Sequence, residues 1–271
     1  MVRYIEPMTS GSPTGADKLN ADVDWDKFDP QEYISRNYLA LHPDDKLILS
    51  IVRDHFGDHF RRNPGRVRSG IDVGAGPNLY PAFTMLPWCD AITQYEWSAA
   101  NVAYLGEQRL DYAPTWNPFW DVLCEGEGGE GYAGLGPNPR ERFRDAVTVR
   151  PGNLYDLGRP GADGEVERWA MGTMFFVAES ITESREEFAR GVACFMDALE
   201  PGAPFAVAFM ENSRGYPVGG EEFPASYVGA VEIRNLLKGF ASDVDPMHIG
   251  KPDDLRDGYT GMILACGHRN D

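Results

Sequence analysis

A glycine-rich turn placed directly after a predicted strand is the first feature of this sequence that could do chemistry. Residues 69–73 read as a short buried strand, and Gly74 and Gly76 follow at alternate positions. Because glycine has no Cβ, such a turn lets the main chain approach a bound nucleoside closely. Glu96 lies 24 residues after Asp72, at the predicted end of the next strand, where a carboxylate can accept both ribose hydroxyls. Together these residues predict a nucleoside-binding site.

The turn lacks the third glycine that phosphate-binding dinucleotide sites carry. In those sites a glycine follows three residues after the second one, and here that position is Leu79. S-Adenosylmethionine contains a ribose and an adenine but no phosphate, and it uses a shorter Gly-x-Gly beside its methionine part. We therefore expect S-adenosylmethionine as the ligand, with a nicotinamide-dinucleotide oxidoreductase as the weaker alternative.

Composition narrows the class of partner. The chain has 271 residues, 42% of them hydrophobic, and a formal net charge of −17. Its length suits one α/β domain with a single core. So acidic a surface repels phosphate backbones and anionic lipid headgroups, which argues against nucleic acid and membranes as partners, although net charge alone decides nothing further. The oligomeric state is not predicted.

No metal site is expected. The four cysteines are far apart in the chain and form no Cys-x-x-Cys pair. His55 and His59 have the helical spacing of two metal ligands, but the sequence offers neither a third ligand nor the glutamate of a His-Glu-x-x-His motif. An N-terminus without an apolar signal core predicts a cytoplasmic location. The low number of lysines relative to arginines is typical of a GC-rich, bacterial genome.

Strands and helices alternate along the chain, as in a doubly wound, mostly parallel sheet. The patterns predict strands over residues 69–73, 91–96, 146–150, 168–177, 205–209 and 260–265. They predict helices over residues 43–61, 79–86, 184–199 and 229–240, and Asp29 before Pro30 marks a further helix start.

The domain organisation expected is one domain over residues 25–271, preceded by a flexible tail over residues 1–24 that is rich in Gly, Ser, Pro and Asp. Residues 25–62 are expected to form a helical lid. Residues 111–145 contain many glycines and prolines and are expected to form an irregular insertion over the active face. Trp116 and Trp120 in that insertion could form a substrate wall or pack inside the insertion.

Five stretches of this sequence resemble, in order and spacing, a distinctive group of methyltransferases. They are FDPQEYISRNYL, IDVGAGPNLYP, TQYEWSAAN, FFVAESITESREEF and ALEPGAP. The group comprises the nicotinamide, phenylethanolamine and indolethylamine (thioether) N-methyltransferases, and the resemblance runs from about Trp25 to the C-terminus. It implies a Rossmann-like class I methyltransferase fold, whose seven-stranded sheet is mostly parallel with an antiparallel last strand.

The resemblance also implies how the cofactor is held. Tyr33 and Tyr38 would close over it, Glu96 would bind the ribose and Trp97 would stack on adenine. An aspartate of the family is absent at the adenine edge, where Gly152 and Asn153 stand. The full set implied for S-adenosylmethionine, and for its product S-adenosylhomocysteine, is Tyr33, Asn37, Tyr38, Asp72, Gly74, Gly76, Pro77, Tyr80, Glu96, Trp97, Asn101, Gly152, Asn153, Leu154 and Ala178.

Glu179 is the catalytic candidate, because in FFVAES it holds the position where amine-methylating members carry an acid that faces the substrate nitrogen. A carboxylate there can bind an ammonium and help to remove its proton, directly or through water. The other acceptor-binding candidates are Trp25, Ser213, Tyr216 and Asp257, with Asp254 as an alternative to the last.

The function expected is methyl transfer to a small molecule, at the nitrogen of an amine or heteroaromatic compound. Two alternatives stay open. The first is a C- or O-methyltransferase that acts on an aromatic or amino-acid-like metabolite, because one fold supports several chemistries. The second is a catalytically silent protein that binds S-adenosylmethionine and regulates a partner.

Overall fold

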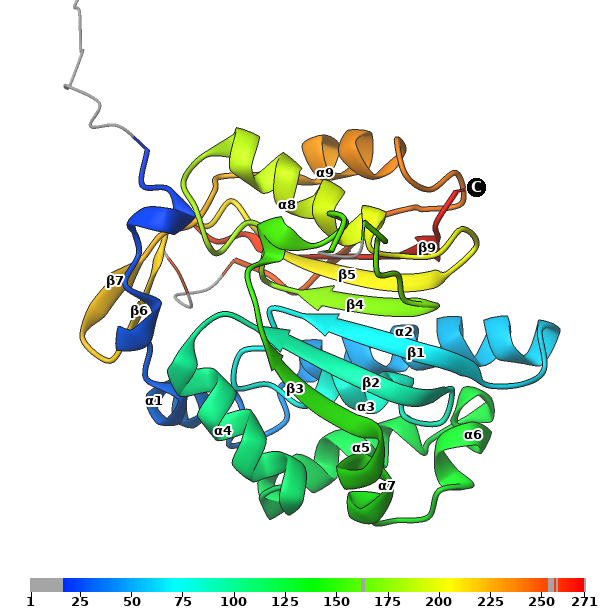
Figure 1. Cartoon of the computed structure of the whole chain (residues 1–271). Helices are drawn as coiled ribbons and strands as arrows, with labels where there is room; N and C mark the ends of the chain where they lie inside the picture. The colour runs from blue at the N-terminus through cyan, green and yellow to red at the C-terminus, as the bar shows by residue number, and fades with distance from the viewer. Residues whose placement is uncertain (1–16, 162–163, 253–255, 257, 271) are drawn as a thin grey trace, which may run out of the picture.

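A seven-stranded sheet runs through the middle of the computed structural model, which describes residues 17–161, 164–252, 256 and 258–270 (Figure 1). Its strand order is β3-β2-β1-β4-β5-β9-β8. The strands are β1 (Val67–Val73), β2 (Cys89–Glu96), β3 (Val147–Pro151), β4 (Met171–Phe175), β5 (Pro204–Glu211), β8 (Met247–Ile249) and β9 (Gly261–His268). β1 to β5 are mutually parallel, and β9 is antiparallel to both β5 and β8. This confirms the predicted mostly parallel sheet with an antiparallel last strand.

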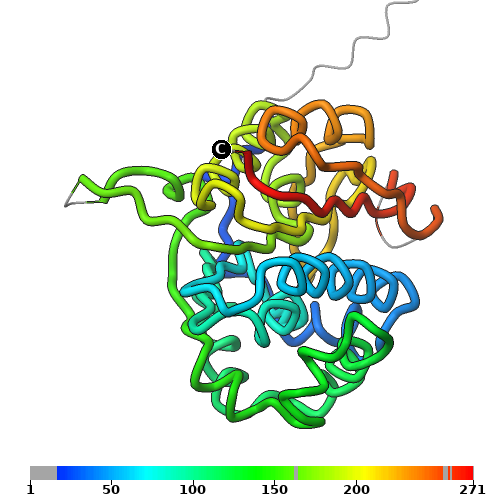
Figure 2. Tube along the Cα trace, turned by 90° about the vertical axis from the view of Figure 1, so that its right-hand side faces the viewer, coloured from blue at the N-terminus to red at the C-terminus, as the bar shows by residue number. Residues whose placement is uncertain are grey.

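Helices cover both faces of the sheet, and β5 shows why. Phe205, Val207 and Phe209 point into the core beneath α8 (Arg185–Asp197) and α9 (Ala230–Leu237). The alternate residues Ala206 and Ala208 point to the opposite core, beneath α2 (Pro43–Arg62) and α3 (Tyr80–Met85). Side chains of a strand alternate between faces, so a strand buried on both sides is apolar throughout. Figure 2 shows α2 lying across the body of the molecule, below the C-terminal strand.

The structure adds elements in three places that the sequence patterns did not indicate. α4 (Ala99–Leu110) follows β2, and the sequence patterns did not indicate it. A hairpin of β6 (Tyr216–Val218) and β7 (Glu221–Phe223) was missed as well, as was β8. Each of these three strands has only three residues, which is too short for a period of two to stand out.

The expected lid over residues 25–62 is wrong for its second half. α2 is part of the central core, with Ile48, Leu49, Val52 and Phe56 fully buried. The covering structure is made instead by the 3-10 turns Asn20–Asp22 and Trp25–Lys27, by α1 (Pro30–Asn37), and by the β6–β7 hairpin. These segments share a small separate cluster in which Trp25 and Phe28 pack on Tyr216, Val218 and Phe223.

Residues 111–145 do not lie over the active face. They form the 3-10 turns Pro114–Trp116 and Glu127–Gly129 and the short helices α5 (Asn117–Leu123), α6 (Glu130–Ala133) and α7 (Arg140–Ala146). α5 packs against α2 and α3, and Trp116 and Trp120 are buried in the core. Trp116 contacts the ring of Tyr38 from behind, with ring centroids 5.4 Å apart. The segment therefore supports the site from the core, and the two tryptophans are core residues, neither a substrate wall nor packing confined to the insertion.

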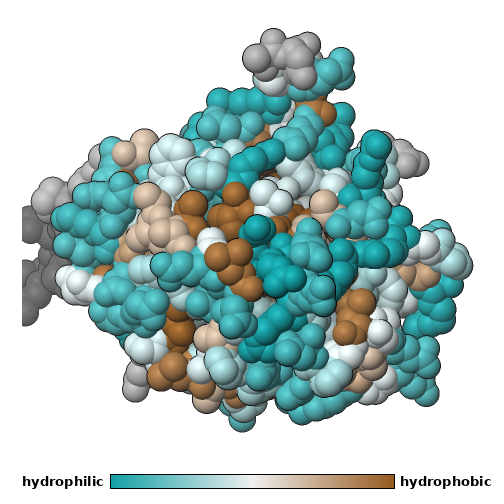
Figure 3. Space-filling view, turned by 60° about the horizontal axis from the view of Figure 1, so that its bottom comes forward, coloured by the Kyte–Doolittle hydropathy of each residue, from teal (hydrophilic) through white to brown (hydrophobic). Residues whose placement is uncertain are grey.

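The face of the molecule in Figure 3 is largely hydrophilic, in line with the net charge. Figure 3 shows one face on which hydrophobic side chains appear only in separate groups between hydrophilic ones. In the part of the chain that the structure describes, no helix is both long and apolar enough to cross a bilayer.

The histidines at helical spacing on α2 meet a third histidine from the sheet. His59 Nδ1 lies 3.0 Å from His268 Nε2, and the rings of His55 and His268 are 5.2 Å apart. His268 Nδ1 lies 2.5 Å from a carboxylate oxygen of Asp243. Among the described residues, no group of three or more His, Cys, Asp or Glu side chains could hold a metal ion.

This cluster predicts a pH-dependent contribution to stability. Burial, with a smaller contribution from His268, lowers the pKa of His55 to about 4. The unfolded chain binds its proton near the ordinary value of about 6.5, so between these limits it binds more protons than the folded chain. The free energy of unfolding therefore falls as pH falls through this window. His55→Gln removes the effect.

We expect the difference in free energy of unfolding between the wild type and His55→Gln to decline by up to about 3 kcal/mol from about pH 7 to about pH 4. Urea denaturation at several pH values measures this difference. The comparison between the two proteins cancels the opposite effect of buried carboxyls such as Asp45 and Asp72. A difference that stays constant with pH would contradict the prediction.

Candidate active site

A cleft of about 890 Å³, part of it open to solvent, lies where β1, β2, β3 and β4 reach their carboxyl ends. These ends point to the side of the molecule that carries α1 and the β6–β7 hairpin (Figure 1). In an open parallel sheet, ligands bind outside the carboxyl ends at the point where the strand order reverses, here between β1 and β4. The cleft is in the position where such a fold binds its ligands.

The glycine turn after β1 forms one wall of the cleft. Gly74 and Gly76 have φ angles of +60° and +55°, which L-residues with a Cβ rarely adopt. A Cβ on Gly74 would also lie 2.4 Å from the side chain of Val177. On the next wall, a Cβ on Gly152 would overlap the Tyr95 ring at 2.1 Å. Both sites need glycine, which leaves the main chain open to a ligand.

Glu96 holds this turn against the end of β2. Its carboxylate accepts hydrogen bonds from the Gly76 and Ser98 N–H groups, each at 2.8 Å. Asn101 Nδ2 donates a third at 3.4 Å. Burial raises the pKa of Glu96, and these hydrogen bonds lower it in part. A carboxylate fixed in this way is ready to accept the hydroxyls of a ribose.

Asp72 is a second carboxylate on the same wall. One of its oxygens accepts a hydrogen bond from Thr173 Oγ1 at 2.9 Å, and the other is buried without a partner among the described residues. Burial raises the pKa of Asp72 to about 7. A carboxylate that lines a cleft and has no ion-pair partner among the described residues suits a cationic ligand group such as an ammonium.

Aromatic side chains from the N-terminal segment close the opposite side. Phe28 and Tyr33 lie 5.2 Å apart between ring centroids, and Tyr33 and Tyr38 lie 5.8 Å apart. Tyr38 Oη accepts a hydrogen bond from Asn78 Nδ2, which ties this wall to the glycine turn. Aromatic faces attract cations, so this wall suits the sulfonium of S-adenosylmethionine.

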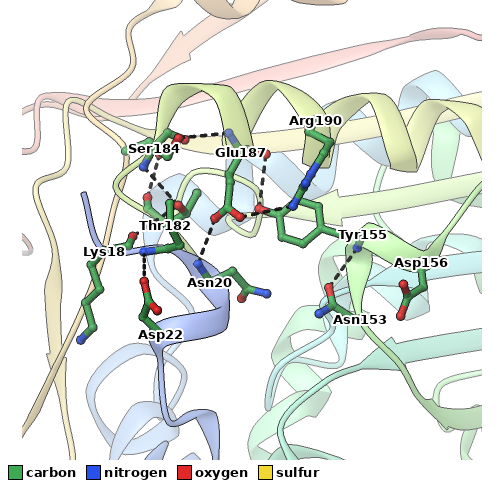
Figure 4. Close-up of polar contacts among 12 residues, drawn as sticks. Lys18, Asn20, Asp22, Asn153, Tyr155, Asp156, Thr182, Ser184, Glu187 and Arg190 are labelled. Carbon is green, nitrogen blue, oxygen red and sulfur yellow. Dashed lines mark hydrogen bonds and ion pairs between the residues drawn. The ribbon is translucent and has the colours of Figure 1, made fainter. Parts of the chain in front are cut away.

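The segment before this wall is fastened to the start of α8. Figure 4 shows Asn20 donating its main-chain N–H to Glu187, at 2.9 Å. The main-chain N–H of Lys18 donates to Glu183 at 2.8 Å, and Trp25 Nε1 donates to Asn20 Oδ1 at 3.0 Å. The expected flexible tail is therefore wrong for residues 17–24, while residues 1–16 lie outside the described part of the chain.

The structure brings most of the predicted site residues to one cleft. From the cofactor set, these are Tyr33, Tyr38, Asp72, Gly74, Gly76, Pro77, Glu96, Trp97, Asn101, Gly152, Asn153 and Leu154, and from the acceptor set they are Trp25 and Tyr216. Trp97 lies at the rim of the cleft and is 54% exposed, so its ring is accessible for stacking on a ligand. Their individual roles stay predictions.

Three residues of the predicted cofactor set do not line this cleft. Tyr80 is fully buried and donates its hydroxyl to Asp45 at 3.1 Å. Ala178 is fully buried as well, on the core side of the β4 end. Asn37 lines two smaller adjoining pockets and donates its side-chain amide to the Tyr33 carbonyl.

The structure corrects the placement of Glu179. Its carboxylate is fully buried behind the cleft wall, where Oε1 accepts hydrogen bonds from the Met210 N–H and the Ser180 hydroxyl, both at 3.0 Å. Burial raises the pKa of this carboxyl. The side chain that lines the cleft here is Ser180. Ser213, the other acceptor candidate of this region, is fully buried and also lines no part of the cleft. Asp257 and Asp254 lie outside the described residues.

Several cleft residues were missed. Asn20 was assigned to the tail, and Phe176, Ser180 and Arg256 sit in loops after strands, where no pattern marks them. Phe176 is one of two non-glycine residues with positive φ in the described chain, at +61°. A backbone strained in this way is frequent at functional sites, but it leaves no trace in the sequence.

Comparison with known proteins agrees with this geometry. The model of the NNMT/PNMT/TEMT family matches residues 17–256. No curated protein sequence matches the chain.

Among solved structures, the CurJ carbon methyltransferase aligns with a TM-score of 0.54 at 10% identity, over 93% of this chain and 62% of its own. The N-methyltransferase NodS from Bradyrhizobium japonicum WM9, bound to S-adenosylhomocysteine, aligns with a TM-score of 0.48 at 11% identity, over 90% and 93%. Magnesium protoporphyrin IX methyltransferase from Synechocystis PCC 6803 aligns with a TM-score of 0.45 at 13% identity, over 82% and 79%. At these identities the likeness to CurJ shows a shared fold.

The first test of the site concerns the Glu96 carboxylate. Glu96→Ala removes the acceptor of the Gly76 N–H and the predicted acceptor of two ribose hydroxyls, so we expect S-adenosylhomocysteine to bind about 100-fold more weakly. Calorimetric titration measures the affinity. Glu107→Ala, which removes an exposed acid from α4, serves as the matched control. Equal affinities for the two variants would contradict the assignment of Glu96.

Asp72 predicts a pH dependence of cofactor binding. With a pKa of about 7, its carboxyl is mostly neutral at about pH 6 and mostly ionised at about pH 8. Since the ionised form attracts the ammonium of the ligand, we expect S-adenosylhomocysteine to bind about tenfold more tightly at the higher pH. Asp72→Asn should abolish this dependence, and the exposed acid variant Asp90→Asn should retain it. Wild-type affinity that does not change with pH would overturn the role of Asp72.

Proposed function

We propose that this chain, which belongs to the NNMT/PNMT/TEMT family, methylates a nitrogen atom of a small amine or heteroaromatic molecule. The chain is an S-adenosylmethionine-dependent small-molecule methyltransferase. The observation that carries the finer proposal is the cleft. It combines a nucleoside-binding wall with an aromatic wall that covers it, and the family match spans both.

The residues of the cleft fit S-adenosylmethionine. A Cβ at Gly74 or Gly152 would clash with a neighbouring side chain, so the main chain is open there. The Glu96 carboxylate is held by hydrogen bonds at the end of β2. Glu96 would hold the ribose, the turn around Gly76 the methionine part, and Asp72 the ammonium. When bound, the cofactor supplies a methyl group on a sulfonium, which the nitrogen lone pair accepts while the carbon–sulfur bond electrons stay on sulfur.

The contribution of the protein is to position the acceptor and to exclude water. Trp25, Phe28, Tyr33 and Tyr216 would form an apolar cover over the reacting atoms. Holding two reactants in line and dry can supply several kcal/mol of the rate enhancement without a covalent step. The cover belongs to a small cluster apart from the main core, so it can open for product release without disturbing the sheet.

Glu179 has a positioning role in this proposal. It accepts the Ser180 hydroxyl, and Ser180 in turn faces the cleft. An amine that arrives as an ammonium would lose its proton to water in the cleft before methylation, because no described carboxylate lines the acceptor side.

Transfer to carbon or oxygen is the second candidate. The withdrawal of Glu179 from the cleft favours it, because an enol, phenol or carboxylate acceptor does not need an acidic residue that binds an ammonium. A cytoplasmic, bacterial small-molecule enzyme remains part of the proposal. Four unpaired cysteines support a reducing compartment, and the charge of −17 argues against nucleic acid as a partner.

We expect the purified chain to form S-adenosylhomocysteine when a panel of small amines, N-heteroaromatics, phenols and carboxylates is added with S-adenosylmethionine. Use of a carbon-13 methyl donor then shows by NMR which atom receives the methyl group. An N-methyl signal supports the proposal, and a methyl signal on carbon or oxygen supports the second candidate. Tight cofactor binding with no turnover of any compound would identify a silent binder and contradict both.

A Glu179→Gln variant tests the positioning role. The glutamine can still accept the Met210 N–H and the Ser180 hydroxyl but cannot take up a proton. We expect kcat to fall by less than about tenfold, with the pH profile unchanged in shape. General-base catalysis would instead give a loss of about 100-fold or more and remove the acidic limb of the profile. That result would restore Glu179 as the catalytic residue.

A further inference from the structure

Arg256 places a positive charge inside the cleft. Its side chain comes from the segment before β9, is only 8% exposed, and lines the cleft beside Ser180 and Tyr216. It also borders the smaller pocket between α1 and β6. Among the described residues that line the main cleft, no other is lysine or arginine. The sequence patterns and the family resemblance give this residue no role.

The guanidinium is held by two contacts, and most of its donors have no partner among the described residues. Its Cζ lies over the Tyr216 ring, 4.1 Å from the ring centroid. Nη1 donates to Ser180 Oγ at 2.9 Å, and in the described part of the chain this is the single hydrogen bond of the guanidinium. Arginine has five N–H donors in one plane. The arrangement leaves an edge free for a planar, two-oxygen acceptor.

No described carboxylate forms an ion pair with Arg256. The nearest connection is indirect: the Ser180 hydroxyl accepts from Arg256 and donates to Glu179. A cation buried to this degree is costly unless an anion pairs with it. The relay through Ser180 gives partial compensation, and among the described residues no carboxylate pairs with the charge on the side that faces the cleft.

We propose that Arg256 binds a carboxylate of the methyl acceptor, so that the substrate is an amine or N-heteroaromatic compound that also carries a carboxylate. This inference rests on the proposed function, because it adds an anchoring group to the same acceptor. A buried arginine repels a simple ammonium compound, whereas an amino-carboxylate presents an anion to it. An amino-carboxylate is a zwitterion without net charge, so the acidic surface does not repel it either.

The carboxylate of the cofactor is a different anion, and a different set of residues is predicted to hold it. The glycine turn, Asp72 and Tyr38 with Asn78 surround the place predicted for the methionine part. Arg256 contacts Ser180 after β4 and Tyr216 of the hairpin, which form another wall. We therefore assign Arg256 to the acceptor.

Matched pairs of compounds test this assignment. Nicotinate with nicotinamide, phenylalanine with phenylethylamine, and tryptophan with tryptamine differ mainly in a carboxylate. Their binding to the complex of the full chain with S-adenosylhomocysteine is measured by calorimetry or ligand-observed NMR, and their turnover by the carbon-13 assay. The variants are Arg256→Gln, which removes the charge, and Arg256→Lys, which keeps the charge but loses the planar fork. Arg214→Gln removes an exposed arginine stacked on Tyr227 and is the control.

We expect at least one carboxylate to bind more tightly than its partner without the carboxylate. Arg256→Gln should weaken that carboxylate by about 30-fold or more and Arg256→Lys by about tenfold, with Arg214→Gln unchanged. Affinity for S-adenosylhomocysteine should stay within about twofold in all three variants, which also shows that they are folded.

Three results would overturn the inference. The first is a loss of S-adenosylhomocysteine binding in a folded Arg256→Gln variant, which would assign the arginine to the cofactor. The second is a consistent preference for the amines without a carboxylate. The third is that no carboxylate in the panel binds. Failure of the proposed function looks different. If the methyl group is found in an ester while Arg256→Gln still weakens carboxylate binding, nitrogen is wrong as the acceptor atom and the arginine contact stands.

Discussion

The hydrogen bonds between the Glu96 carboxylate and the main chain of the glycine turn are the constraint on which the rest of the site depends. Glu96 ends β2 and accepts the N–H of Gly76, which follows β1. It adds to the pairing of β1 with β2 and to the hydrogen bond from the Gly74 N–H to the Tyr95 carbonyl, and so fixes the turn beyond the strand ends. The turn can take this path only because Gly74 and Gly76 adopt positive φ angles and Gly74 leaves room for Val177. The nucleoside wall is thus built by main chain and one buried acid, before any ligand arrives.

The two walls of the cleft have different physical origins. The sheet side rests on two large apolar cores, one on each face, and its geometry is fixed by strand pairing. The N-terminal side rests on a cluster of a few aromatic and aliphatic side chains and on hydrogen bonds to the start of α8. A segment with fewer buried contacts opens at a lower free-energy cost than the core. The asymmetry lets one wall hold the nucleoside while the other admits and releases ligands.

Periodicity predicted the parts of the fold that long stretches of sequence determine. Strands buried on both faces are apolar throughout, and the predicted helix over residues 43–61 matches α2 within one residue of each end. The same signals are weak for three-residue strands and for α4, in which only three residues are buried. The glycine turn and Glu96 could be found because their chemistry needs fixed spacing along the chain. The hydrogen bond from the Asn20 N–H to Glu187 could not be predicted, because the two residues are 167 positions apart in the chain.

The direction of a single side chain at a strand end lies beyond such patterns. Glu179 and Ser180 are neighbours after β4, and a small change in backbone angle decides which of them faces the ligand. Phe176, with its positive φ, changes the course of the chain just before them. Serine therefore lines the cleft, and glutamate accepts its hydroxyl from behind. The position of Glu179 in its motif predicted an acid that faces the substrate, but the motif does not determine the side to which the carboxylate turns.

The net charge of the whole chain and the charges that line the cleft also have to be considered separately. A net charge of −17 suggests a preference for cations, yet surface charges act weakly beyond about 8–10 Å at physiological salt. Inside the cleft, the field is set by the groups that line it, Asp72 and Glu96 on the nucleoside side and Arg256 on the other. The Arg256–Ser180–Glu179 relay lowers the cost of burying both ends, so each charge helps to retain the other. An acidic protein can thus present a positive charge to its substrate, because a single buried arginine outweighs many screened carboxylates at that distance.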